Sequence, residues 1–134
     1  MKTQIEFKST AFPAYPDEGE QVNPGRYGKR LAEFLAGALG KHGFDVQGIR
    51  SEDWGWAVDL KNEDFPLWVG CGNYEEFADG FLCFIEPSKP TVKKGWLSKI
   101  ETGPTVERLA SALENSLSES GKVSDIRWWA DNER

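Results

Sequence analysis

The spacing of apolar residues predicts two amphipathic helices. Over residues 31–39, apolar side chains recur at the i, i+3, i+4, i+7 spacing of one helical face. Asn23-Pro24 precedes this stretch and suits the N-cap and first helical positions, so we expect the first helix to begin there. A second apolar stripe over 106–117 follows Pro104 and ends before Gly121, which suits a helix C-terminus.

Between the two predicted helices lie four short segments of apolar or alternating residues, separated by polar turns. Such spacing favours an antiparallel meander. Two shorter strands are expected near the ends of the chain, at 4–8 and 124–129. The order β-α-β-β-β-β-α-β then predicts an α+β fold, with both helices on one face of the sheet and residues 1–134 in a single domain. The four central segments are 44–50, 54–61, 65–72 and 81–86.

Two stretches, 9–22 and 87–103, show no regular pattern. The second contains four lysines and is flanked by proline. Long irregular loops are uncommon in compact domains unless they have a role. We expect either a surface loop whose Trp96, Leu97 and Ile100 pack onto the domain, or a mobile binding loop.

Alternation along the strands separates the two faces of the predicted sheet. The face away from the predicted core becomes apolar at Trp68, Leu82 and Phe84, although a half-solvated sheet should be polar there. These apolar side chains could be covered by the 87–103 segment, by a second subunit in a homodimer, or by a ligand. Gly70 and Gly72 leave the sheet bare beside Trp68, as happens where an aromatic ring or a ligand lies against backbone. The predicted core residues are Phe44, Val46, Trp56, Val58, Leu60, Leu67, Val69, Cys71, Phe81, Cys83 and Ile85.

Alternate turns of a meander emerge at the same end of the sheet, so the turns at 51–53 and 73–80 should be neighbours. Together they would form a rim of carboxylates and aromatic rings, with Asp79 adding to its charge. Aromatic anchors surrounded by charge are typical of protein interfaces. The candidate partner-binding residues are Glu52, Asp53, Trp54, Asn73, Tyr74, Glu75 and Glu76.

The charge of the chain narrows the class of partner. It has 22 acidic and 16 basic residues, giving a net charge of −6. This balance argues against a nucleic-acid partner, which requires clustered Lys and Arg, and it favours a basic protein. No apolar run approaches the ~20 residues that cross a bilayer, and the N-terminus lacks the apolar region of a signal peptide. We therefore expect a cytoplasmic location and no membrane partner.

Catalytic and cofactor motifs do not emerge from the sequence. The single histidine has no evident nucleophile partner, and neither of the glycine-rich phosphate motifs occurs. Cys71 and Cys83 fall on one face of adjacent predicted strands, where inert buried thiols are favoured over a redox pair. We expect no catalytic residue, no cofactor and no metal site. A hard-cation site and paired-carboxylate catalysis at the acidic rim are weaker alternatives.

These patterns favour a non-enzymatic protein-binding module that uses the acidic, aromatic rim. In size, charge and tryptophan content the chain resembles immunity proteins of toxin systems, a resemblance of composition that transfers no residue roles. The alternative is a small-molecule-binding domain or small enzyme. Its pocket would lie between the sheet face near Trp68 and the 87–103 segment around Trp96.

Overall fold

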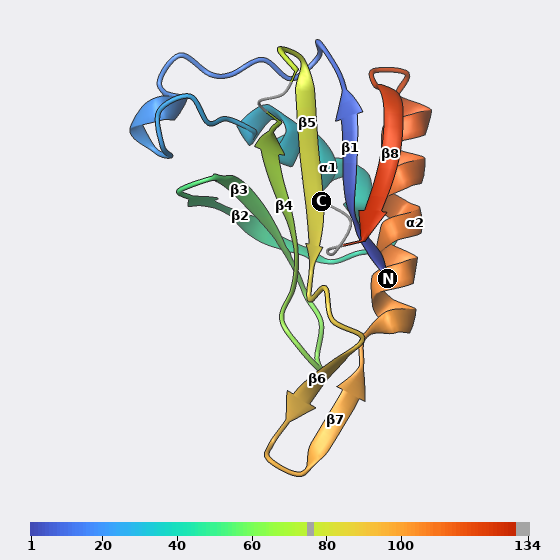
Figure 1. Cartoon of the computed structure of the whole chain (residues 1–134). Helices are drawn as coiled ribbons and strands as arrows, with labels where there is room; N and C mark the ends of the chain where they lie inside the picture. The colour runs from blue at the N-terminus through green and yellow to red at the C-terminus, as the bar shows by residue number, and fades with distance from the viewer. Residues whose placement is uncertain (75–76, 131–134) are drawn as a thin grey trace.

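The computed structural model describes residues 1–74 and 77–130, which form eight strands, two α-helices and one short 3₁₀ helix (Figure 1). The α+β fold and the expected order of elements are confirmed, with one additional hairpin, β6 and β7. The elements are β1 (Lys2–Lys8), η1 (Glu18–Glu20), α1 (Lys29–Lys41), β2 (Val46–Glu52), β3 (Gly55–Leu60), β4 (Leu67–Asn73), β5 (Gly80–Glu86), β6 (Thr91–Lys94), β7 (Ser98–Glu101), α2 (Gly103–Ser120) and β8 (Ser124–Ala130).

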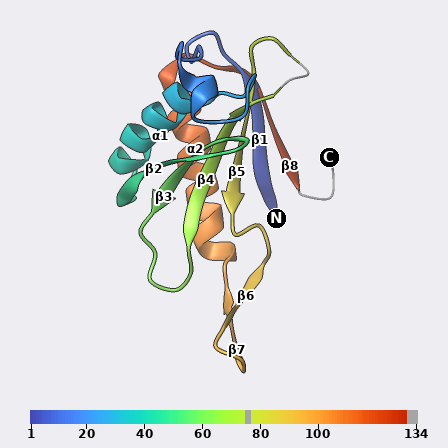
Figure 2. The same cartoon turned by 90° about the vertical axis from the view of Figure 1, so that its left-hand side faces the viewer.

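The main sheet has six antiparallel strands in the order β2-β3-β4-β5-β1-β8. Strands β2 to β5 form the predicted meander, and β1 and β8 extend it beyond β5. Helices α1 and α2 lie together on one face, behind the sheet in Figure 1 and to one side of it in Figure 2. The opposite face, which carries Trp68, Leu82 and Phe84, is called the outer face below.

The core lies between the sheet and the helices, on the face that the alternation predicts. Val58 is paired with Val69, which is paired in turn with Ile85, and all three are fully buried. The other residues on the predicted core phase are also buried, except Val46, which is half-buried. Burial of these side chains is the main favourable contribution to folding.

Helix α2 follows its sequence signals closely. Pro104 lies in the first turn, where its missing N–H costs no helical hydrogen bond. Gly121 ends the helix in the left-handed region, with φ of 69°. The apolar stripe that includes Val106, Leu109 and Leu113 is buried against the core, as its spacing predicts.

Helix α1 begins later than the sequence indicates. Asn23-Pro24 does not open the helix, because the chain makes a turn there, with the Arg26 N–H donating to the Asn23 carbonyl at 3.0 Å. The helix begins at Lys29 instead. Gly28 brings this end of the helix against β4, where an added Cβ would lie 2.6 Å from the Cys71 carbonyl oxygen.

The start of α1 is fixed by the buried carboxylate of Glu18, which is 2 % exposed. Its Oε2 accepts hydrogen bonds from the backbone N–H groups of Gly28 at 2.7 Å and Lys29 at 3.0 Å. The same oxygen accepts from the Trp56 indole N–H at 2.9 Å, and Oε1 accepts from the Tyr15 N–H at 2.9 Å. Glu18 therefore supplies the cap that α1 lacks locally and joins the 9–28 segment to β3.

The 87–103 segment, expected to be irregular, contains the antiparallel β6–β7 hairpin. Figures 1 and 2 both show the hairpin extending beyond the end of the main sheet. Val92 and Ile100 are partners in its register and pack against the core. Trp96 and Leu97, expected to pack onto the domain, are instead 88 % and 79 % exposed in the turn.

We expect Glu18→Gln to lower the free energy of unfolding by about 2 to 4 kcal/mol. The amide offers one acceptor oxygen, so its NH₂ group would face donors that the carboxylate now satisfies. Chemical denaturation measures the loss. Glu20→Gln, on the exposed side of the same 3₁₀ turn, is the matched control and should change stability by less than about 0.5 kcal/mol. Equal stability of the two variants would contradict this role for Glu18.

Candidate functional site

Three aromatic rings form a cluster on the outer face of the sheet. The ring centroid of Trp54 lies 6.0 Å from that of Trp68 in a nearly parallel stack, and 4.9 Å from that of Phe84. Trp68 and Phe84 are 5.6 Å apart and nearly perpendicular. All three side chains are half-buried, so each keeps a surface that a partner can contact. We call Trp54, Trp68 and Phe84 the aromatic cluster.

The backbone of the sheet makes room for this cluster. Gly70 is directly opposite Phe84 in the β4–β5 register, and the Phe84 ring lies over it. A Cβ on Gly70 would be 2.3 Å from that ring. Gly70 therefore allows close approach of an aromatic ring to the backbone, as the sequence predicts.

The side chain that covers Trp68 and Phe84 does not come from the 87–103 segment. Trp54, in the turn between β2 and β3, packs on both rings. The 87–103 segment reaches this face near Trp68, where Val92 and Lys93 line the same shallow hollow. Trp54 of the predicted rim thus packs on Trp68 and Phe84 of the predicted apolar face.

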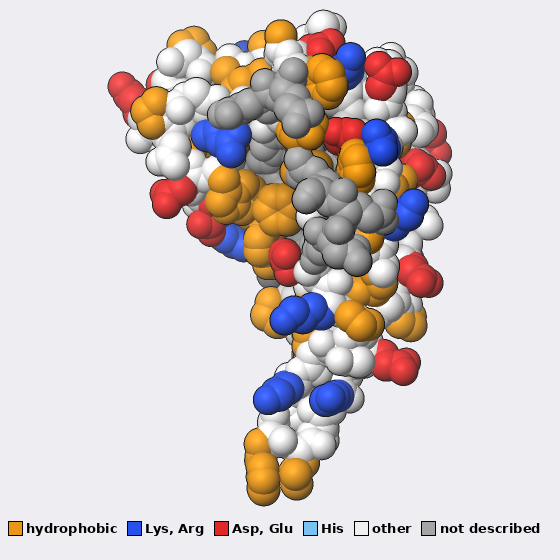
Figure 3. Space-filling model, in the orientation of Figure 1, with side chains coloured by type: hydrophobic (Ala, Val, Ile, Leu, Met, Phe, Trp, Pro, Cys, Tyr) orange, Lys and Arg blue, Asp and Glu red, His pale blue; other side chains and the backbone are white. Residues whose placement is uncertain are grey.

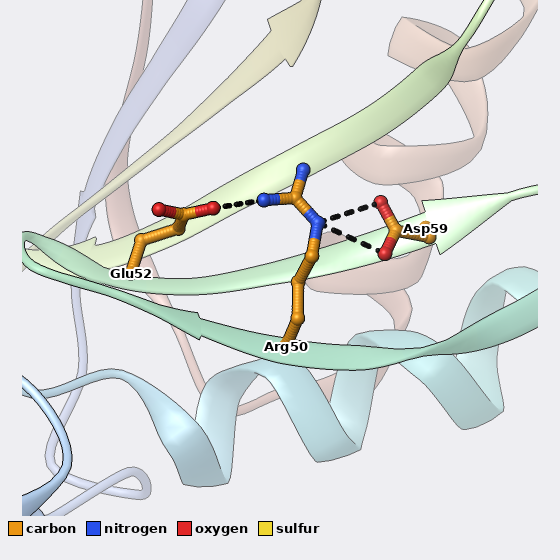
Figure 4. Close-up of polar contacts among 3 residues, drawn as sticks. All are labelled: Arg50, Glu52 and Asp59. Atoms are coloured by element: carbon orange, nitrogen blue, oxygen red, sulfur yellow. Dashed lines mark hydrogen bonds and ion pairs between the residues drawn. The ribbon is translucent and has the colours of Figure 1, made fainter.

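Charged side chains from β2 and β3 contact one another next to Trp68, and Figure 4 shows these contacts among Arg50, Glu52 and Asp59. The Arg50 guanidinium lies 4.8 Å from the Trp68 ring centroid. Its Nε donates to both carboxylate oxygens of Asp59, at 3.1 and 3.0 Å, and its Nη1 donates to Glu52. Each partner is between a third and two fifths exposed, so these ion pairs add little stability and mainly orient the arginine.

Arg50 and Asp59 are parts of the site that sequence reasoning missed. The alternation along the strands indicates these two residues, because it puts both side chains on the same face of the sheet as Trp68. Their mutual contact depends on the pairing of Arg50 with Ala57 in β3, which no sequence motif marks.

The acidic side chains of the predicted rim differ in their surroundings. Glu52 is paired with Arg50, whereas Asp53 is exposed. The two turns are linked through residues 23–27: the Asn23 N–H donates to the Asp53 carbonyl at 2.9 Å, and the Asn73 N–H donates to the Tyr27 carbonyl at 2.8 Å.

Asn73 and Tyr74 both contact their own chain. The Asn73 amide oxygen accepts from the Tyr27 N–H at 3.0 Å, and its amide nitrogen donates to the Gly25 carbonyl at 3.1 Å. The Tyr74 ring lies 6.0 Å from that of Phe77. Asn73 thus holds the loop in place. The remaining two rim residues, Glu75 and Glu76, lie outside the described residues.

Leu82 is half-buried on the outer face, opposite Gly72 of β4. Trp96, grouped with it as a candidate for a pocket or dimer face, lies at the end of the projecting hairpin instead. The shallow hollow beside Trp68 has a volume of about 290 Å³ and is also lined by Phe65, Val92 and Glu86. It lies where the alternative pocket was expected, but Trp96 does not line it.

The two cysteines are buried, unbridged and directly opposite each other in the β4–β5 register. A side-chain hydrogen bond with Cys71, followed by burial, raises the pKa of the Cys83 thiol well above its usual value. The thiol, which is the unreactive form, therefore predominates at neutral pH.

Within residues 1–74 and 77–130, no three His, Cys, Asp or Glu side chains gather closely enough to hold a metal ion. No helix in that part of the chain is long and apolar enough to span a bilayer. No protein-family model, curated protein or solved structure matches this chain. The function is therefore inferred from the arrangement of its side chains.

We expect neither Cys71 nor Cys83 to react with a soluble thiol reagent in the native protein near neutral pH. Both should react fully once denaturant exposes them, because the folded core excludes the reagent and keeps Cys83 protonated. A colorimetric thiol titration with and without denaturant measures this. Stoichiometric labelling of the native protein would contradict the buried, unreactive pair.

Proposed function

We propose that this protein is a non-enzymatic protein-binding module whose binding surface is the aromatic cluster and its charged border. The observation that carries the proposal is the stack of Trp54 on Trp68 and Phe84, on the sheet face that the helices leave uncovered. Large half-exposed aromatic rings beside an arginine have the composition of interface hot spots.

The cluster is held in place before any partner arrives. Phe84 rests on Gly70, and Arg50 is held over Trp68 by Glu52 and Asp59. Ordering flexible side chains at an interface opposes binding, so side chains that are already packed lower that cost. The prior packing of these side chains therefore supports a role of the cluster in binding.

The partner is proposed to be a basic protein. Asp53 is exposed next to Trp54, and Glu52 and Asp59 outnumber the single arginine between them. The net charge of −6 also attracts basic surfaces over longer distances.

Zero-length coupling of carboxylates to amines, followed by mass spectrometry, tests the proposal in a lysate. We expect a cross-link from Asp53 to a lysine of one partner, weakened by high salt. Trp54→Ala should lower the affinity for that purified partner about 30-fold or more, because hot-spot truncations cost about 2 kcal/mol. The variant's folding is checked by thermal melting.

The matched control is Glu107→Lys, which changes an exposed acid on α2, on the opposite side of the sheet. It should weaken partner binding far less than Trp54→Ala does, because it changes the overall charge and not the proposed surface. Binding that survives Trp54→Ala but fails in Glu107→Lys would place the interface on the helices and contradict the proposal.

The second candidate is a small-molecule site in the hollow beside Trp68. Its volume of about 290 Å³ lies at the lower limit of typical ligand pockets. This favours a single inserted side chain over a whole ligand. A second copy of the chain could supply that side chain, so light scattering of the purified protein separates a homodimer from binding of a foreign partner.

A further inference from the structure

The turn of the β6–β7 hairpin exposes two adjacent large apolar residues. Trp96 is 88 % exposed and Leu97 is 79 % exposed. Gly95 precedes them with φ of 69°, which permits the tight turn. The space-filling view shows apolar side chains at the far end of the projecting hairpin and basic side chains along it (Figure 3). We call Trp96 and Leu97 the hairpin tip.

Lysines surround the hairpin behind this tip. Lys89, Lys93, Lys94 and Lys99 are all exposed. Lys93 is directly opposite Lys99 in the register, an arrangement that is unfavourable in an isolated hairpin. Alternation puts Lys94 on the other face of the hairpin, so positive charge lies on both faces. Among the described residues, Lys94 alone of the four is ion-paired, with Asp64 at 3.6 Å.

The hairpin tip lies beyond the end of the main sheet. Strand β6 ends at Lys94, and residues 95–97 form the turn. The body acid Asp64 lies 3.6 Å from the Lys94 ammonium. The Debye length at physiological salt is about 8 Å. Negative charge farther away than this is largely screened at the tip. Asp64 pairs with Lys94, whereas Lys93 and Lys99 supply positive charge beside the tip.

We propose that the hairpin tip docks on an anionic phospholipid surface. Tryptophan prefers the interface between headgroups and acyl chains, and lysines are attracted to anionic headgroups. Stable attachment without a spanning helix needs two such signals, and this hairpin combines them. The proposal revises the sequence-based expectation of no membrane partner, which rested on the lack of a long apolar run and could not reveal the exposed tip.

A flat anionic surface fits these features better than an acidic protein cleft. A stable protein interface takes about 20 to 30 residues from each side. The hairpin, from Thr91 to Glu101, is much smaller and points end-on. Lysines on both of its faces match a plane approached from the tip, whereas a protein cleft would favour charge on one side.

Co-sedimentation with lipid vesicles tests the proposal directly. The chain of 134 residues is mixed with vesicles of neutral phosphatidylcholine, or with vesicles in which roughly one third is anionic phosphatidylglycerol. We expect sedimentation with the anionic vesicles, little with the neutral ones, and loss of binding at about 1 M salt.

Two double variants test the apolar tip and the lysines separately. Trp96→Ser with Leu97→Ser should abolish sedimentation, and Lys93→Gln with Lys99→Gln should weaken it about 25-fold, roughly fivefold per lysine. Both pairs are exposed, and the lysine variant relieves a like-charge contact, so folding should be preserved. Lys41→Gln with Lys61→Gln, which removes two exposed lysines from the body, is the matched control and should bind as wild type does.

Absence of sedimentation with the anionic vesicles would overturn the proposal and favour an acidic protein cleft as the partner of the hairpin tip. Equal sedimentation of the wild type and both hairpin variants would also overturn it, because the body would then be the part that binds lipid. Circular dichroism of every variant distinguishes these outcomes from loss of folding.

Discussion

The buried carboxylate of Glu18 is the interaction on which the arrangement of this protein depends. A carboxylate with 2 % exposure is tolerated only where its oxygens are satisfied, and this one accepts four hydrogen bonds. Two donors are the N–H groups of Gly28 and Lys29 at the start of α1, and a third is the indole of Trp56 on β3. One side chain thus caps the helix, orders the segment before it and attaches both to the sheet.

Glu18 holds the start of α1 on the face of the sheet that α2 also covers. With α1 and α2 held on one face, the outer face keeps its aromatic cluster available beside Arg50 and its two carboxylate partners. The β6–β7 hairpin projects from the end of the sheet and carries the opposite charge. The two proposed surfaces adjoin at the hollow beside Trp68, which Val92 and Lys93 of the hairpin also line.

Periodic patterns were sufficient to predict most of the fold, because burial on one face imposes alternation in strands and a stripe on helices. Val58 and Leu109 are examples. The start of α1 could not be predicted, because its cap comes from Glu18, ten residues before Gly28 and within an irregular stretch. The hairpin was missed because lysines dominate it and Val92 and Ile100 are its only packed apolar residues among those described. The position of Trp54 depends on how a turn folds back, which no periodicity encodes.

Hydrogen exchange at the tryptophan indoles, followed by NMR, tests the role of Glu18 most directly. The Trp56 Nε1–H donates to the buried carboxylate, whereas Trp96 is 88 % exposed and serves as the reference in the same sample. Trp56→Phe and Trp96→Phe assign the two signals. The Trp56 indole proton should exchange only through global unfolding, many orders of magnitude more slowly than that of Trp96. Exchange of both protons at similar rates would contradict the account.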